Sequence, residues 1–240
     1  MNVTKDQDPA YQSKYVITSD MDWASTEIID ELLEIFDRYS IRATFFCTHK
    51  VSFHKHELAL HPYFQASKDE METLQSLHDM FPKAKGVRAH TLYLHSRLFK
   101  IYKKLGIQYD SNYLLPDQQV QPFFISKGIL EIPMFFEDDY YLTFSDKDFS
   151  VKDLNLNISG LKVFNFHPIH VYLNTESMSR YKRAKKFYSQ PSNLRRYRNN
   201  GKGIKTLLVD LLDHLKKKEI ETFTLIEIND RWRKNNSQPP

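Results

Sequence analysis

Cysteine is nearly absent from this sequence: Cys47 is the only one among 240 residues. A single cysteine excludes an intrachain disulfide and a cysteine-rich zinc cluster. Glycine is scarce, with six residues, and no long polar tract is present, which argues against a fibrous or disordered chain. No apolar run approaches the length of a membrane span, and residues 1–9 lack the apolar stretch of a signal peptide. We therefore expect a soluble, cytoplasmic protein.

The remaining composition predicts one well-packed domain. Hydrophobic residues make up 41% of the 240 residues, enough for a sizeable core in a single domain over residues 1–240. The net charge of +4 is unevenly placed, because residues 180–205 contain ten lysines or arginines and no acid. Such a stretch could meet a phosphate, a sugar acid or a nucleic acid; we expect a solvated basic insertion or loop over residues 176–205 rather than a nucleic-acid arm. Residues 1–14 are expected to form a polar extension.

A short apolar strand followed by two carboxylates lies near the start of the chain. Residues Tyr15 to Thr18 are aromatic or β-branched, which favours a buried strand. Asp20 and Asp22 lie two positions apart, so in extended backbone both side chains leave the same face. Two carboxylates on one face repel each other unless a cation or a shared proton lies between them, although turns also use aspartates at this spacing. The pair is a candidate site only if other polar residues converge on it.

Helices and strands alternate along the rest of the chain. The predicted helices cover residues 25–39, 67–81, 97–105 and 206–218, and the predicted strands cover residues 43–47, 57–61, 86–90, 107–110, 130–136, 161–166 and 221–228. This alternation is typical of a parallel α/β fold, in which polar groups at the carboxyl ends of strands gather at one rim. The residues expected at that rim are Asp20, Asp22, His61, Arg88, His90, His167 and His170.

Several motifs, in this order, resemble those of the NodB-homology polysaccharide deacetylases, carbohydrate esterase family 4. The similar stretches are Thr18-Ser-Asp-Met-Asp22, Ile41-Arg-Ala-Thr-Phe-Phe46, Glu57-Leu-Ala-Leu-His61, Leu105-Gly-Ile-Gln-Tyr-Asp-Ser111 and the tail from Leu211 to Ile228. The similarity spans residues 15–230. More narrowly, three short motifs resemble those of a WbmS-like branch linked to bacterial surface polysaccharide synthesis. These motifs are Asp-x-Asp-Trp, Leu-His-Pro and Phe-His-Pro-Ile-His.

The resemblance implies an α/β fold of the irregular, incomplete (β/α)7 barrel type that holds one divalent metal ion. Carried over residue by residue, Asp20 would be the general base and Arg88 the arginine that orients it. Asp22 and His61 would be metal ligands. His167 would be the general acid.

Two positions depart from the family pattern. The second histidine of the family, four residues after the first, is replaced by Gln65, and Arg-x-Pro is replaced by Arg88-Ala-His90. His90 would leave its strand on the same face as Arg88, so we expect it to be the third ligand, with Gln65 as the alternative. One carboxylate and two imidazoles suit zinc first, with iron, cobalt or nickel as alternatives.

The expected function is that of a metal-dependent hydrolase that removes an N-acetyl group from a sugar or oligosaccharide in surface polysaccharide or lipopolysaccharide biosynthesis. Two alternatives stay open: hydrolysis of another non-peptide C–N bond, and a catalytically degenerate member that binds glycan or a protein partner. Candidate substrate-binding residues are Trp23, Glu137, Asp138 and His170. Glu131 is expected at a solvent-exposed strand edge because Pro133 is nearby.

Overall fold

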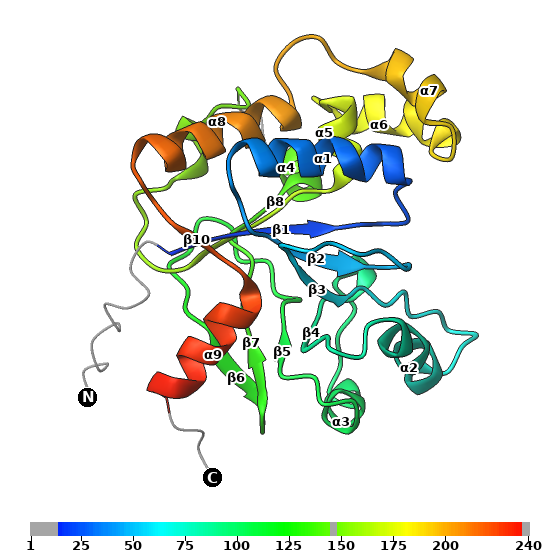
Figure 1. The fold of residues 1–240 in the computed structure, drawn as a ribbon, viewed down its shortest axis with the longest axis vertical. Coiled ribbons are helices and arrows are strands. Elements are labelled where there is room, and N and C mark those ends of the chain that lie inside the picture. The colour runs from blue at the N-terminus through cyan, green and yellow to red at the C-terminus, as the bar shows by residue number, and fades with distance from the viewer. Residues whose placement is uncertain (1–13, 145–147, 237–240) are drawn as a thin grey trace.

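The computed structural model describes residues 14–144 and 148–236 and is built around a ten-stranded sheet (Figure 1). The strands are β1 (Tyr15–Asp20), β2 (Thr44–Cys47), β3 (Glu57–Leu60), β4 (Gly86–Val87), β5 (Tyr109–Asp110), β6 (Phe123–Ser126), β7 (Ile129–Glu131), β8 (Phe136–Glu137), β9 (Lys162–Asn165) and β10 (Thr222–Phe223). Their order is β6-β7-β5-β4-β3-β2-β1-β9-β8, with β10 paired to β1 outside this path. Only β6 and β7 pair antiparallel within the described ranges, and β6 and β8 do not pair with each other. The predicted α/β fold with an incomplete, open barrel is confirmed.

Helices pack on both faces of this sheet. They are α1 (Thr26–Arg38), α2 (Glu70–Met80), α3 (Leu98–Lys104), α4 (Asp138–Phe144), α5 (Pro168–Leu173), α6 (Met178–Ala184), α7 (Pro191–Leu194), α8 (Ile204–Lys217) and α9 (Leu225–Asn235), with short 3-10 turns η2 (His90–Leu92), η3 (Val151–Leu154), η4 (Lys185–Phe187) and η5 (Arg195–Tyr197). Figure 1 shows α1, α5 and α8 together on one side of β1, where α1 packs on α5 and α5 on α8. No helix among the described residues has the length and apolar character needed to cross a membrane.

Strand β1 lies in the middle of the sheet and is buried along its whole length. Its side chains alternate: Tyr15 and Ile17 join the core under the helices, while Val16 joins a second core on the opposite face. By the same alternation Thr18 and Asp20 lie on the face of Val16, so the apolar strand delivers polar groups to that face only at its carboxyl end. The burial of this strand explains why Asp20 needs protein partners.

Three predicted strands end earlier than the sequence pattern indicates. The last one, predicted over residues 221–228, stops at Phe223, because Thr224 and Glu227 form a capping box that starts α9. The run over residues 130–136 splits into β7 and β8. The strand predicted over residues 86–90 ends at Val87, and the chain turns into η2 at His90.

The basic stretch over residues 176–205 is largely helical and is not the expected loop. It contains α6, η4, α7 and η5, and several of its arginines and lysines have partners. Arg198 and Lys205 both pair with Glu31 of α1, and Arg180 donates to the carbonyl of Tyr197 at 2.9 Å. Of the predicted polar extension, residues 1–13 lie outside the described part of the chain.

Candidate functional site

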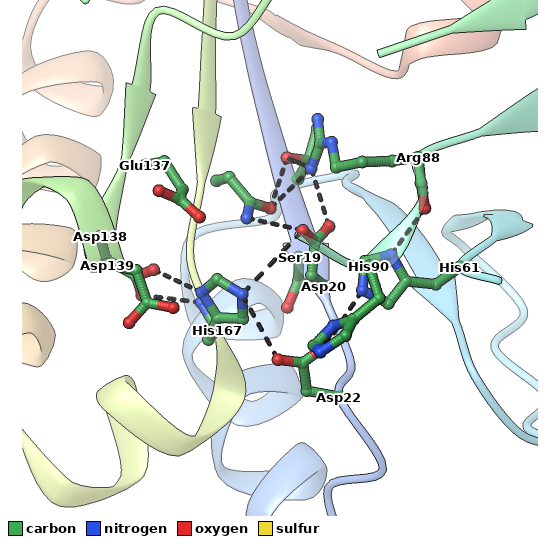
Figure 2. Close-up of polar contacts among 12 residues, drawn as sticks. Ser19, Asp20, Asp22, His61, Arg88, His90, Glu137, Asp138, Asp139 and His167 are labelled. Atoms are coloured by element: carbon green, nitrogen blue, oxygen red, sulfur yellow. Dashed lines mark hydrogen bonds and ion pairs between the residues drawn. The ribbon is translucent and has the colours of Figure 1, made fainter. Parts of the chain in front are cut away.

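The predicted site residues meet at the carboxyl ends of neighbouring strands. Asp20 ends β1, His61 directly follows β3, Arg88 follows β4, and His167 lies two residues after β9. Figure 2 shows these side chains facing one another around one space. The rim expected from the alternation of helices and strands is therefore present.

Asp20 and Arg88 form a buried ion pair at the base of this space. Arg88 is fully buried and donates from Nη1 to Asp20 Oδ1 at 2.8 Å. The same nitrogen also donates to Thr18 Oγ1 at 3.0 Å and to Asn165 Oδ1 at 2.8 Å. Asn165 returns a hydrogen bond from Nδ2 to Asp20 Oδ2 at 3.1 Å. Each oxygen of Asp20 thus has a donor, which fixes the orientation of the carboxylate.

A second edge of the Arg88 guanidinium group, formed by Nε and Nη2, is held by Ser111. Nε donates to the Ser111 carbonyl at 2.9 Å and Nη2 to its hydroxyl at 2.8 Å. The guanidinium also lies 4.1 Å from the centre of the Phe46 ring, a cation–π contact. The arginine is therefore fixed independently of the aspartate that it orients.

Asp22, His61 and His90 form a second cluster beside the ion pair. Asp22 Oδ1 lies 3.0 Å from His61 Nε2 and 3.0 Å from His90 Nδ1. His61 Nδ1 lies 2.7 Å from the carbonyl oxygen of Arg88. A carbonyl oxygen can only accept a hydrogen bond, so Nδ1 carries the hydrogen and donates it. In the neutral ring Nε2 then presents a lone pair to the carboxylate. Two lone pairs at this distance need a proton or a cation between them.

This cluster fits a divalent metal ion. Three ligand atoms, one each from Asp22, His61 and His90, lie within 4.8 Å of one another. Metal bonds to nitrogen and carboxylate oxygen are about 2.0–2.2 Å long, so one ion can reach atoms spaced at 3.0 Å. Donation from the far ring nitrogen of His61 to a backbone carbonyl is the usual support of a metal-binding histidine. His90, rather than Gln65, is the side chain that meets Asp22, while Gln65 lines the neighbouring cleft.

The surroundings of Asp22 favour its ionised form. Burial alone would raise the pKa of Asp22, but the hydrogen bonds with His61 and His90 and the charge of His167 hold that pKa below its usual range. The carboxylate is therefore available as an anionic ligand at neutral pH.

His167 lies across the space from these ligands, as Figure 2 shows. Its Nε2 is 4.0 Å from Asp20 Oδ2 and 3.7 Å from Asp22 Oδ2. Its Nδ1 is 2.5 Å from Asp138 Oδ1, and its backbone N–H donates to Asp138 Oδ2 at 2.8 Å. Burial lowers the pKa of His167, but the charges of Asp138, Asp139 and Asp22 outweigh burial and raise it well above its usual value. A protonated Nε2 consequently faces the space.

Two residues expected to bind substrate are buried behind His167. Asp138 is fully buried and both of its oxygens are bonded to His167, so it supports the histidine. His170 is 1% exposed, with Nε2 2.7 Å from Asp139 Oδ1 and Nδ1 3.1 Å from Thr175 Oγ1. Both side chains thus have protein partners in this structure, and their contact with a substrate stays a prediction.

Trp23 is exposed and Glu137 is half-buried. Burial raises the pKa of Glu137 to about 7, the charge of His167 opposes this rise, and the charges of Asp138 and Asp139 add to it. Trp23 is 46% exposed and packs edge-on against His90, with ring centres 5.3 Å apart. Trp23 and His61 line a cleft of about 680 Å³ together with Tyr63, Gln65 and Lys68. This cleft therefore reaches the metal-ligand cluster at His61.

Glu131 lies away from the site and is fully buried, so the expectation of an exposed strand edge is wrong. It is the register partner of Asp110 across β5 and β7, and burial raises the pKa of both carboxyls. Glu131 Oε1 accepts from the backbone N–H of Tyr113 at 3.1 Å and Asp110 Oδ1 from that of Asn112 at 2.9 Å. Asn112 Oδ1 in turn accepts from Ala89 N–H at 2.9 Å, which supports the backbone before His90.

Sequence reasoning missed Asn165 and Tyr188. Asn165 could have been found, because alternation in the strand ending at Phe166 places it on the same face as Val163. Tyr188 donates its hydroxyl to the Asp22 carbonyl at 2.7 Å from 166 residues further along the chain, and no local pattern indicates that contact.

The chain is similar to known proteins in both family and fold. A family model described as WbmS-like polysaccharide deacetylase matches residues 17–185. No curated protein matches the chain significantly. Among solved structures, the chain is similar to a protein from Bordetella bronchiseptica, which is described as a polysaccharide deacetylase involved in O-antigen biosynthesis. The two sequences are 28% identical and the structures match with a TM-score of 0.80. The match covers 87% of this chain and 93% of that one.

Two more distant structures share the fold. A protein from Mycobacterium smegmatis described as a polysaccharide deacetylase is 14% identical, with a TM-score of 0.59 over 97% of this chain and 95% of that one. A pseudoenzyme of carbohydrate esterase family 4 from Bacillus anthracis is 12% identical, with a TM-score of 0.51 over 92% of this chain and 68% of that one. Because a pseudoenzyme shares the fold, activity has to be argued from the site itself.

Proposed function

The chain belongs to the WbmS-like polysaccharide deacetylase family, and we propose that it is a metal-dependent hydrolase that removes an N-acetyl group from a sugar. One observation carries this proposal. An oriented carboxylate, a protonated histidine and three convergent ligand atoms face the same space, with His167 Nε2 3.7–4.0 Å from Asp22 Oδ2 and Asp20 Oδ2. Amide hydrolysis needs these parts together: a base for water, an acid for the amine and charge stabilisation for the oxygen.

Asp22, His61 and His90 would hold the metal ion, with zinc as the first choice for one carboxylate and two imidazoles. When bound, the ion supplies Lewis-acid activation of the acetyl carbonyl and of the attacking water. The ring of His61 is oriented for this task by the carbonyl of Arg88.

Asp20 would act as the general base. Its Oδ1 is held by Arg88 and its Oδ2 accepts one hydrogen bond from Asn165, which leaves a lone pair of Oδ2 free to take a proton from water. Because Arg88 is fully buried and fixed by Ser111, the carboxylate keeps its direction while it changes charge.

His167 would act as the general acid. Asp138 accepts the hydrogen of Nδ1, so the transferable proton is on Nε2, which faces Asp20 and Asp22. That proton goes to the leaving amine when the C–N bond breaks, and the products are acetate and the free amino sugar. Asp138 also stabilises the imidazolium before the transfer.

The replacement of the family's second histidine by Gln65 favours the alternative of a degenerate, binding-only protein. The contact of His90 with Asp22 supports catalysis instead, because a third ligand atom is supplied from a different strand end. The similarity to the Bordetella protein, which is described as involved in O-antigen biosynthesis, supports an acetylated sugar of a surface polysaccharide as the substrate.

The test is acetate release from a panel of N-acetylated sugars and sugar nucleotides by zinc- or cobalt-loaded protein. We expect Asp20→Asn to lower kcat by about 10²–10⁴-fold, the usual contribution of a general base. The matched control is Asp37→Asn, an exposed carboxylate on α1 that pairs only with Lys55 in the described structure. Loaded parent protein that binds the sugars but releases no acetate would favour the binding-only alternative; release from formamides or cyclic imides alone would favour hydrolysis of another C–N bond.

A further inference from the structure

The turn that presents Asp22 has an unfavourable backbone conformation. Asp22 and Trp23 have φ values of 42° and 57°, so two consecutive residues that are not glycine lie in the left-handed region. Aspartate tolerates this region, but a bulky tryptophan rarely adopts it. Such a conformation persists only where the surroundings hold it.

Two side chains from elsewhere in the chain hold this turn. The hydroxyl of Tyr188 donates to the carbonyl oxygen of Asp22 at 2.7 Å, and the hydroxyl of Thr48 accepts from the N–H of Trp23 at 3.0 Å. Within the turn, Ala24 N–H donates to the Met21 carbonyl at 2.8 Å. The peptide group between Asp22 and Trp23 is thus held on both sides, by its oxygen and by its nitrogen.

Tyr188 itself belongs to a segment that is fastened to the helices next to the turn. It directly follows η4 in the basic stretch, which pairs with α1 through Arg198 and Glu31. The hydroxyl of Tyr172 in α5 donates to the carbonyl of Pro191 at 3.1 Å, and the guanidinium of Arg198 lies 4.0 Å from the centre of the Tyr172 ring. Tyr188 therefore approaches Asp22 from a segment whose position does not depend on the turn.

We propose that Tyr188 is a positioning residue of the metal site, which holds the left-handed turn so that the Asp22 carboxylate meets His61 and His90. The inference rests on the proposed metal site. Without the hydroxyl, the Asp22–Trp23 peptide relaxes toward a common backbone region, and Oδ1 leaves the point that is 3.0 Å from both imidazoles. The helical part of the basic stretch, which carries Tyr188, then belongs to the site.

The test compares Tyr188→Phe with the parent and with Tyr197→Phe. Tyr197 lies in the same segment, and in the described structure its hydroxyl makes no hydrogen bond, so the two variants lose the same atom. Zinc dissociation constants are measured by competition with a chromophoric chelator, and the stability of the metal-free proteins by urea unfolding. We expect the Kd for zinc to rise about 10-fold in Tyr188→Phe only, as for loss of a supporting partner of a metal ligand. Metal-free stability should change little, because losing the bond also releases the backbone strain.

A Kd in Tyr188→Phe equal to that of Tyr197→Phe would overturn this inference and leave the proposed function in place. A parent that binds no zinc or cobalt would overturn both. If Tyr188→Phe does not fold, the pair Thr48→Val and Thr48→Ser tests the same turn from its other side: the first should weaken zinc binding, and the second, which keeps the hydroxyl, should restore it. Equal zinc affinity in that pair would also count against the proposal.

Discussion

Replacing Arg88 by methionine should destabilise the metal-free protein strongly. The change keeps an unbranched apolar chain but removes the donors to Asp20, Thr18, Asn165 and Ser111. Arg88 is fully buried and Asp20 is 4% exposed, so the carboxylate would be left as a buried charge without its partner. Breaking a buried pair in this way costs about 3–5 kcal/mol. For a chain of this size such a loss lowers Tm by about 10 °C.

Urea unfolding in the presence of a chelator measures this loss without interference from metal release. The double variant Asp20→Asn with Arg88→Met should recover part of it, because the buried charge is then removed as well; the coupling energy expected for residues in contact is about 0.5–3 kcal/mol. Arg183→Met is the control, since Arg183 is exposed and bonds only to Ser179 in the described structure. A loss below about 1 kcal/mol, as for a surface pair, would refute the reasoning.

Three further predictions concern single groups. Asp138→Asn should lower kcat about 10²–10⁴-fold with little change in KM, because it disturbs the general acid; an unchanged kcat in steady-state assays would exclude this role. Trp23→Ala should raise KM more than it lowers kcat, since Trp23 lines the cleft beside the ligands; the opposite pattern would place it in the chemistry. Burial raises the pKa of Glu131 and Asp110, so the folded state keeps a proton that the unfolded state loses, and this pair makes stability fall as pH rises above their ordinary values. Glu131→Gln should weaken that fall in urea unfolding between about pH 5 and about pH 8; an identical pH profile would contradict the shared burial cost.

The sequence was sufficient to predict which polar side chains meet at the ends of the strands. Asp20, His61, Arg88 and His167 each follow an apolar run, and parallel strands bring their carboxyl ends to one rim. Helical periodicity likewise located α1 and α8, because each has one continuous apolar face.

Other features depend on contacts that no local pattern indicates. The acidic run from Glu137 to Asp139 is typical of a solvated turn, yet the start of α4 buries Asp138 against His167. Tyr188 reaches Asp22 from a basic stretch whose composition is typical of a loop. The start of α9 was predictable in principle, because Thr224 and Glu227 have the capping-box spacing, but the preceding β-branched run favoured a longer strand.

Anomalous diffraction from crystals grown with zinc tests the central claim most directly. Data collected at the zinc edge should show one strong peak bonded to Asp22, to Nε2 of His61 and to Nδ1 of His90, with room left for water and substrate on the side of His167. The same crystals of His90→Ala should lose most of this peak. A peak bonded to Gln65 in place of His90, or no peak between these side chains in protein soaked with zinc or cobalt, would contradict the proposed site.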